Sequence, residues 1–242
     1  AVRLPGVTKL YNCAQEPEIL WLQKMVYEMG ADVSGAQSGQ ICIYGGNALR
    51  DCEFWVPPDR IVAGTYLAAA AVTGGDVTLT GICPEHLQAA ASKLQETGCL
   101  IQFTEDTVRI QAPRHLGGMQ KIETLPYPGF PTDLQAQFMA VACVCHGTCI
   151  LSENVFENRF KHVPELCRMG ARIQIKERTA VVRGGAPLMG AEVAAKDLRG
   201  GAALVIAGLA AKGRTTVEGK CFIDRGYQDL AAELSALGAE IR

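Results

Sequence analysis

Residues 59–80 read DRIVAGTYLAAAAVTGGDVTLT, which is a helix signal followed directly by a strand signal. Asp59 can cap a helix that begins at Arg60, because its carboxylate can accept hydrogen bonds from the free amide groups of the first turn. The Ala-rich body of this helix is predicted to end at the pair Gly74–Gly75, since glycine commonly ends helices. Alternating side chains over residues 76–80 then predict a short strand.

A second helix and two further strands complete this local unit. Pro84 suits the first turn of the second helix, which is predicted to end at Gly98. Residues 99–104 and 107–110 then predict two strands joined by a turn at residues 105–106. The unit therefore has the order helix, strand, helix, strand, strand.

The same order returns twice, from Asp133 and from Asp197. Both aspartates are expected to cap helices as Asp59 does, and these helices are expected to end at Gly147 and Gly213. Capping alone would explain all three aspartates, although a chemical role stays open for each of them.

Two series of glycines show that the repeat extends over the whole chain. In the first series each glycine follows an apolar helical run, and in the second an aliphatic residue stands four positions after each glycine. Both series have intervals of about 70 residues, which is the signature of an internal repeat. The members are Gly30, Gly98, Gly170 and Gly238 in the first series and Gly6, Gly75, Gly147 and Gly213 in the second.

The first copy of the repeat differs from the others. Its strand is predicted over residues 6–12 with no Asp-capped helix before it, so the chain is expected to start inside a repeat. Strands need neighbours and helices need a sheet, so the copies are expected to pack together. The predicted fold class is α+β, built from repeated βαβαββ units and incomplete at the N-terminus.

The composition argues against several classes of protein. The chain has 242 residues, of which 48% are apolar and 20% charged, so it is long and apolar enough to form a packed core. A formal net charge of -2 argues against nucleic acid as a partner. The longest apolar run, residues 200–211, is too short to span a membrane and predicts a buried helix instead, so no membrane partner is expected.

The ten cysteines lie mostly inside apolar segments and are expected to be reduced thiols. The densest cluster contains Cys143, Cys145, His146 and Cys149, a composition that can bind zinc. Cys143 and Cys145 stand two apart on a predicted helix and therefore point to different faces. No metal site is expected.

Three arginines, Arg159, Arg199 and Arg225, stand near predicted helix starts, where the helix dipole does not favour cations. A small anionic ligand at converging helix N-termini would explain them. Ion pairs with neighbouring Asp and Glu side chains would explain them equally well. The residues alone leave both explanations open.

Several motifs resemble the enolpyruvyl transferases that act on UDP-N-acetylglucosamine. The most specific are YPGFPTDLQAQF at residues 127–138, ENRF at 157–160 and HVPEL at 162–166. Shorter matching segments lie at residues 16–19, 59–61, 197–199 and 223–227. The resemblance thus covers essentially the whole chain.

The resemblance implies a fold of two domains, each made of three such units around a pseudo-threefold axis, in an inside-out α/β barrel. Residues 1–57 then correspond to the last, partial repeat of the first domain. Residues 58–242 correspond to three repeats that form most of the second domain, without its opening strand. The first part of a family member is expected to be absent.

The resemblance also implies a reaction and a set of site residues. Family members transfer the enolpyruvyl group of phosphoenolpyruvate to the 3'-hydroxyl of UDP-N-acetylglucosamine, without a cofactor, in the bacterial cytoplasm, for peptidoglycan synthesis. By this resemblance Asp133 is the catalytic base, and Asp133 and Val155 bind the UDP-sugar. Arg159 and Arg199 face the carboxylate of phosphoenolpyruvate, and Arg225 faces its phosphate. Asp59 and Asp197 match family aspartates whose role is structural or accessory.

The chain departs from the family in one major respect. The family's proton-donating Cys or Asp lies in the segment that this chain lacks, as do a Lys-Asn pair and an Arg that bind phosphoenolpyruvate. None of the ten cysteines lies in a matching motif. The chain alone is therefore expected to be inactive, with a separate chain that carries the missing segment as one conceivable partner. The alternative is a truncated, non-catalytic module that binds a sugar nucleotide or has a structural role.

Overall fold

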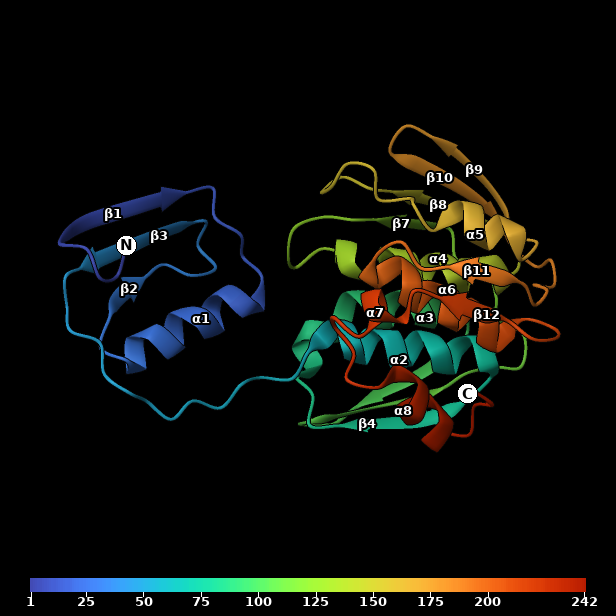
Figure 1. Cartoon of the computed structure of the whole chain (residues 1–242), viewed down its shortest axis with the longest axis horizontal. Helices are drawn as coiled ribbons and strands as arrows, with labels where there is room; N and C mark the ends of the chain where they lie inside the picture. The colour runs from blue at the N-terminus through green and yellow to red at the C-terminus, as the bar shows by residue number, and fades with distance from the viewer. The chain divides into compact units, whose positions relative to one another are not determined.

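The computed structural model describes residues 1–242, which form two compact units (Figure 1). Unit 1 comprises Ala1–Pro58 and Pro126–Gly129, and unit 2 comprises Asp59–Leu125 and Phe130–Arg242. None of the helices combines the length and the apolar character that crossing a membrane requires.

Unit 1 contains one helix and a three-stranded antiparallel sheet with the strand order β1-β3-β2. Its elements are β1 (Gly6–Tyr11), α1 (Pro17–Glu28), β2 (Asp32–Ser34) and β3 (Gln40–Gly45). The strand predicted over residues 6–12 is therefore present, one residue shorter than expected.

One face of the unit 1 sheet is open where the corresponding face in unit 2 is covered. Leu10 on β1 lies opposite Ile41, and its repeat equivalent Leu151 lies opposite Ala180. Leu151 is 0% exposed, because helix α4 packs against its sheet, whereas Leu10 is 44% exposed. Unit 1 has no helix equivalent to α4 among its elements.

In unit 2 the predicted order of helix, strand, helix, strand, strand is present in the first two repeats, but the prediction is wrong for the third repeat, which lacks the last two strands. In the second and third repeats a short strand precedes the long apolar helix. The first repeat consists of α2 (Arg60–Thr73), β4 (Asp76–Thr80), the 3₁₀ helix η1 (Pro84–Leu87), α3 (Gln88–Glu96), β5 (Leu100–Phe103) and β6 (Thr107–Gln111). The second consists of β7 (Lys121–Glu123), the 3₁₀ helix η2 (Thr132–Leu134), α4 (Gln135–Val144), β8 (Thr148–Ser152), α5 (Val163–Arg168), β9 (Arg172–Lys176) and β10 (Thr179–Arg183). The third consists of β11 (Glu192–Ala194), α6 (Leu198–Ala210), β12 (Thr216–Glu218), α7 (Lys220–Ile223) and α8 (Leu230–Ala236).

The strands of unit 2 form three sheets around a helical centre. The strand orders are β4-β6-β5, β7-β8-β10-β9 and β11-β12. The pairs β7–β8 and β11–β12 are parallel, so α4 and α6 are crossover helices of βαβ units. Helices α2, α4 and α6 lie in the middle of the unit (Figure 1) and are lined by fully buried Leu67, Phe138 and Leu204. The predicted buried helix over residues 200–211 is thus confirmed as α6.

Two of the three predicted aspartate caps are confirmed and one is wrong. Asp59 accepts hydrogen bonds from the amides of Ile61 and Val62, and Asp197 accepts one from Gly200 at 2.7 Å. Asp133 caps no helix, because the short turn η2 precedes α4 and the Asp133 carboxylate bonds to side chains from other segments.

The predicted helix-ending role of glycine holds at Gly74 and Gly98 but not at Gly147 and Gly213. Gly98 stands just after the end of α3, with φ 91°, and its amide donates to the carbonyl of Gln95. Gly74 ends α2 in the left-handed conformation, with φ 68°. Helix α4 ends at Val144 and α6 at Ala210, so Gly147 and Gly213 lie beyond these helices. Their positive φ values of 87° and 89° serve the turns into the next strands instead.

Candidate functional site

Three of the predicted site residues meet in one ion-pair cluster in unit 2. The Asp133 carboxylate accepts a hydrogen bond from Nη2 of Arg199 at 3.0 Å and a short one from Nη2 of Arg159. Asp133 comes from η2, Arg159 from the irregular segment before α5, and Arg199 from the first turn of α6. Two guanidinium groups share one carboxylate, so the cluster keeps an excess of positive charge. Both sequence-based explanations, ion pairing and an anion site, are compatible with this arrangement.

Arg199 is the most buried cation of the cluster, with 15% of its side chain exposed. Burial alone would lower its pKa, but Asp133 and then Tyr227 raise the pKa of Arg199 above its ordinary value. Its Nη1 atom is buried and has no hydrogen-bond partner. The guanidinium is therefore charged inside the protein, and the N–H groups of Nη1 are free to donate a hydrogen bond to a ligand.

Arg225 does not stand at a helix start, so that part of the prediction is wrong. It follows the short helix α7, whose last turn is closed by the amide of Asp224. Its side chain is exposed and forms no ion pair or hydrogen bond. Arg225 is thus an uncompensated surface cation, and nothing within the chain uses its charge.

Val155 is linked to the segment that carries Asp133 by Glu153, a residue that the sequence did not single out. Glu153 is 1% exposed, and its carboxylate accepts bonds from the Thr132 hydroxyl at 2.9 Å and from the amides of Val155 and Phe156 at 3.0 and 2.9 Å. It therefore ties the segment after β8 to the residue before Asp133. The amide of Val155 is occupied by Glu153, which leaves its carbonyl as the backbone group open to a ligand.

His162 is a second buried polar residue beside the cluster that the sequence did not single out. Burial is the main cause that lowers its pKa to about 4; Asp197 opposes this shift and the nearby Arg159 adds to it. Its Nε2 atom has no partner. A Cβ atom on Gly200 would lie 3.1 Å from the Cβ of His162, so the imidazole packs directly against the start of α6.

We expect His162 to make the protein less stable in acid. Its folded-state pKa of about 4 is below the ordinary 6.5, so the unfolded chain binds the proton more readily. The stabilisation is complete above the ordinary value and is lost as the pH falls through about 4, with a total of about 3 kcal/mol. Denaturant unfolding between pH 7 and 4, together with NMR titration of the imidazole, measures this.

His162→Phe is the matched variant, because it keeps a ring and removes the titrating group. The pH-dependent part of its unfolding free energy should shrink, whatever its absolute stability. An His162 resonance that titrates at the ordinary value in the folded chain would contradict the prediction.

The buried cysteines are poorly suited to chemistry. Burial raises the pKa of Cys143, Cys145 and Cys149 to about 12, so these side chains stay protonated thiols at neutral pH. A protonated thiol is neither a nucleophile nor a good zinc ligand.

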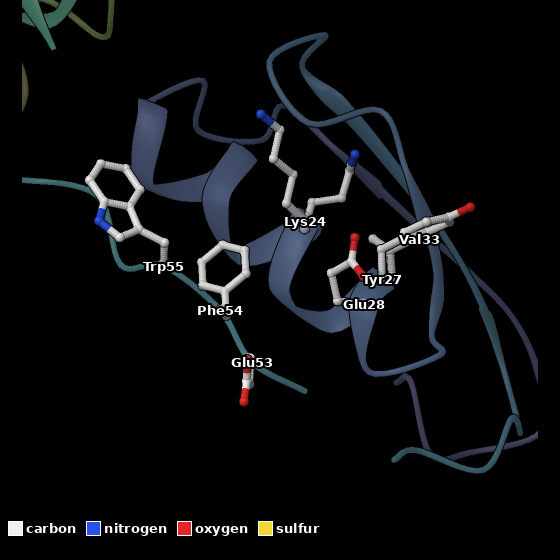
Figure 2. A pocket seen from close by; sticks show the side chains of 8 residues that line it. Lys24, Tyr27, Glu28, Val33, Glu53, Phe54 and Trp55 are labelled. Atoms are coloured by element: carbon white, nitrogen blue, oxygen red, sulfur yellow. The ribbon is translucent and has the colours of Figure 1, made fainter. Parts of the chain in front are cut away.

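A hollow in unit 1 contains none of the sequence-predicted site residues, all of which belong to unit 2. It measures about 580 Å³. In Figure 2, Phe54 and Trp55 of the segment after β3 lie beside α1, from which Lys24, Tyr27 and Glu28 project. Its polar groups are of both charge signs and none is buried, so it does not have the character of a site that holds an anion.

Relatives with established names match the whole chain. The sequence model of the EPSP synthase (3-phosphoshikimate 1-carboxyvinyltransferase) family matches residues 1–234. A UDP-N-acetylglucosamine 1-carboxyvinyltransferase 2 of Caldanaerobacter subterraneus is 50% identical over 236 residues, which cover 98% of this chain and 57% of the relative. The UDP-N-acetylglucosamine 1-carboxyvinyltransferase of Myxococcus xanthus is 50% identical over 242 residues, which cover 100% of this chain and 57% of the relative.

Solved structures show the same fold. The enolpyruvyl transferase NikO from Streptomyces tendae matches with a TM-score of 0.87 and 27% identity, over 100% of this chain and 57% of that one. EPSP synthase from Acinetobacter baumannii matches with a TM-score of 0.75 at 19% identity, over 100% of this chain and 58% of that one, which supports the fold alone. The chain thus spans less than three fifths of the length of these relatives. With its repeated βαβαββ units and its match over residues 1–234, the chain belongs to the EPSP synthase family of carboxyvinyltransferases.

Proposed function

We propose that this chain is the part of a UDP-N-acetylglucosamine 1-carboxyvinyltransferase that carries the catalytic base and about half of the anion-binding groups. The observation that carries the proposal is the meeting of Asp133, Arg159 and Arg199 from three separate segments. Relatives about 50% identical over the whole chain bear this enzyme's name. The proposal includes a bacterial cytoplasmic location and a role in peptidoglycan synthesis.

In the proposed reaction Asp133 takes the proton of the 3'-hydroxyl as that oxygen attacks the enolpyruvyl carbon of phosphoenolpyruvate. An acid from outside this chain protonates the methylene group to a methyl group. Loss of phosphate together with one proton of that methyl group then restores the double bond. Cations are needed throughout, because both the carboxylate and the phosphate of phosphoenolpyruvate are anionic.

The arginines suit this role because their present partner can be exchanged. A substrate carboxylate that enters the cluster can accept hydrogen bonds from Arg159 and Arg199, which Asp133 now accepts. Asp133 is then free to accept a proton. The unpaired Arg225 supplies a further cation for the phosphate, and the open carbonyl of Val155 supplies an acceptor for the UDP-sugar.

The second candidate is a module that binds a sugar nucleotide, or has a structural role, without catalysis. The observation in its favour is that the chain spans only 57% of its curated relatives. Such a module would retain the Asp133 cluster and bind ligand without turnover.

We expect the chain alone to give no phosphate release from phosphoenolpyruvate and UDP-N-acetylglucosamine, because the proton-donating residue and the other cations are supplied by neither unit. The same chain joined to the remaining N-terminal part of the Myxococcus xanthus relative, here called the completed enzyme, should release phosphate only when both substrates are present. A coupled phosphate assay measures both proteins.

The controls separate the two candidate functions. Phosphate release by the chain alone, from a preparation free of any full-length enzyme, would contradict the prediction. A completed enzyme that is folded and binds UDP-N-acetylglucosamine in calorimetry, yet gives no turnover, would favour the non-catalytic module. Turnover by the completed enzyme supports the proposed function.

A further inference from the structure

Glu153 is a buried carboxylate between two segments that meet at the ion-pair cluster. It is 1% exposed and stands directly after β8, at the start of the irregular segment that leads to Arg159. Its Oε2 accepts a hydrogen bond from the Thr132 hydroxyl at 2.9 Å. Its Oε1 accepts hydrogen bonds from the amides of Val155 and Phe156 at 3.0 and 2.9 Å. The two oxygens of one side chain therefore bind two different segments.

The bond from Thr132 holds the backbone that carries Asp133. Both residues belong to the short turn η2, in which the amide of Leu134 donates to the carbonyl of Pro131 at 3.0 Å. A single 3₁₀ turn contains few backbone hydrogen bonds, so a side-chain bond to a buried carboxylate adds substantially to its rigidity. Glu153 thus helps to fix the point from which the Asp133 carboxylate reaches the arginines.

The bond from Phe156 holds the residue on which Arg159 rests. Cζ of Arg159 lies 5.3 Å from the centroid of the Phe156 ring, within the range of a cation–π interaction. Phe156 is 51% exposed, so burial does not hold its ring in place. The ion pair of Glu157 with Arg178 at 3.1 Å is exposed and is therefore a weak tether for this segment. The carboxylate of Glu153 is the buried group that fastens it.

Together these contacts form a closed circuit. Glu153 binds Thr132, and the next residue, Asp133, accepts a hydrogen bond from Arg159. Arg159 lies over the ring of Phe156, whose amide donates back to Glu153. The ion pair itself is partly exposed, and an exposed pair has little rigidity of its own. Its geometry is therefore set from the buried side of the circuit.

The same carboxylate sets the direction of the Val155 carbonyl. The amide of Glu153 donates to a carbonyl of the turn between β9 and β10 at 2.8 Å, and the amide of Asn154 donates to Oγ1 of Thr124 at 2.9 Å. The amides of Val155 and Phe156 follow with their bonds to Glu153. Four successive amides thus have partners within the chain, while the carbonyl of Val155 has none.

We propose that Glu153 is a positioning residue. Its buried carboxylate fixes Asp133, Arg159 and the carbonyl of Val155 relative to one another. It touches no substrate in this proposal and acts through these three groups. The inference rests on the proposed function, in which these groups bind the substrates, but their placement can be tested separately from binding.

The test uses Thr132→Val in the full chain, because Glu153→Ala would also deprive two amides of their acceptor. Valine has nearly the shape of threonine but cannot donate to Glu153. Thr132→Ser keeps the hydroxyl and is the conservative variant. Thr97→Val is the matched control, because the Thr97 hydroxyl is also buried in unit 2 and donates to the carbonyl of Leu94 at 2.7 Å, outside the ion-pair cluster.

The first readout is the guanidinium resonance of Arg159. The chain is labelled with ¹⁵N-arginine, and the resonance is assigned with Arg159→Lys. Thr132→Val should shift it, because the Asp133 carboxylate that Arg159 binds is no longer held in place. Thr132→Ser should return it towards the wild-type position, and Thr97→Val should leave it unchanged. Thermal melting of the same samples measures the loss of stability in each variant.

The second readout is calorimetric titration with UDP-N-acetylglucosamine. Loss of one hydrogen bond to a carboxylate predicts about tenfold weaker binding in Thr132→Val. Binding by Thr132→Ser should stay near the wild-type level, and Thr97→Val should cause no change.

Each outcome decides the proposal. An Arg159 resonance that stays in place in folded Thr132→Val overturns it, and so does unchanged binding by this variant when the wild-type chain binds. Equal losses of melting temperature in Thr132→Val and Thr97→Val, with no change in the arginine signal, show a packing role only and also overturn it. A wild-type chain that does not bind UDP-N-acetylglucosamine counts against the proposed function, while an Arg159 shift confined to Thr132→Val still supports the positioning role.

Discussion

Asp133→Asn should lower the turnover of the completed enzyme by about 10²- to 10⁴-fold, the range typical of the loss of a general base. The substitution keeps the volume and shape of the side chain but removes the group that can accept a proton. No helix cap is lost, because Asp133 caps none. The fold should therefore survive, although Arg159 and Arg199 lose their shared carboxylate.

The matched control is Asp76→Asn. Asp76 is also an arginine-paired carboxylate in unit 2, bonded to Arg109 at 2.7 Å, and it is 49% exposed against 38% for Asp133. Its substitution causes the same chemical change outside the ion-pair cluster and should leave turnover unchanged. Turnover near the wild-type level in a folded Asp133→Asn enzyme would show that Asp133 only organises the two arginines.

Arg225→Ala should raise the KM of the completed enzyme for phosphoenolpyruvate by about ten- to hundredfold, the range expected when a charge-assisted hydrogen bond is lost. It should leave the melting temperature unchanged, because Arg225 forms no ion pair or hydrogen bond within the chain. Thermal melting and steady-state kinetics on the same preparation measure the two effects together.

Arg109→Ala is the counterpart for this variant. It removes an arginine of unit 2 that does have an intramolecular partner, since Arg109 bonds to Asp76 through both Nε and Nη2. Any loss should therefore appear in stability and not in the KM for phosphoenolpyruvate. A large drop in melting temperature with unchanged kinetics in Arg225→Ala would mark Arg225 as structural and would remove the best case for an anion site.

Local signals in the sequence were sufficient for much of the fold. The cap at Asp59, the left-handed stop at Gly74 and the strand over residues 76–80 all depend on neighbours within one turn, and all are confirmed. The cap assigned to Asp133 failed because a single turn of 3₁₀ helix stands between it and α4. Its carboxylate is instead engaged by arginines 26 and 66 residues away in the sequence.

The candidate site shows the same division between local and long-range information. Arg159 and Arg199 could be selected from the sequence because they stand near predicted helix starts and match family motifs. Their convergence on the carboxylate of Asp133 depends on the tertiary structure and could not be predicted. Glu153 carries no local signal, and His162 and Tyr227 lie in segments that resemble the family without a local sign of their own role. An acidic, an imidazole and a phenol side chain are ordinary at any surface position. Their importance arises only from burial, which makes each polar contact obligatory.

The open sheet face of unit 1 has a consequence for how the chain resists unfolding. Local stability follows the apolar area that each segment buries, and proteins open in cooperative parts whose free energies of opening differ widely. In unit 2 the equivalent residue Leu151 is fully buried beneath α4, whereas Leu10 is 44% exposed and accessible to water. Unit 1 should therefore fluctuate open long before unit 2 does, and amide protons in β1–β3 should exchange with solvent while those of α4 and α6 are still protected. We therefore expect unit 2 to stay folded under conditions in which unit 1 already unfolds locally.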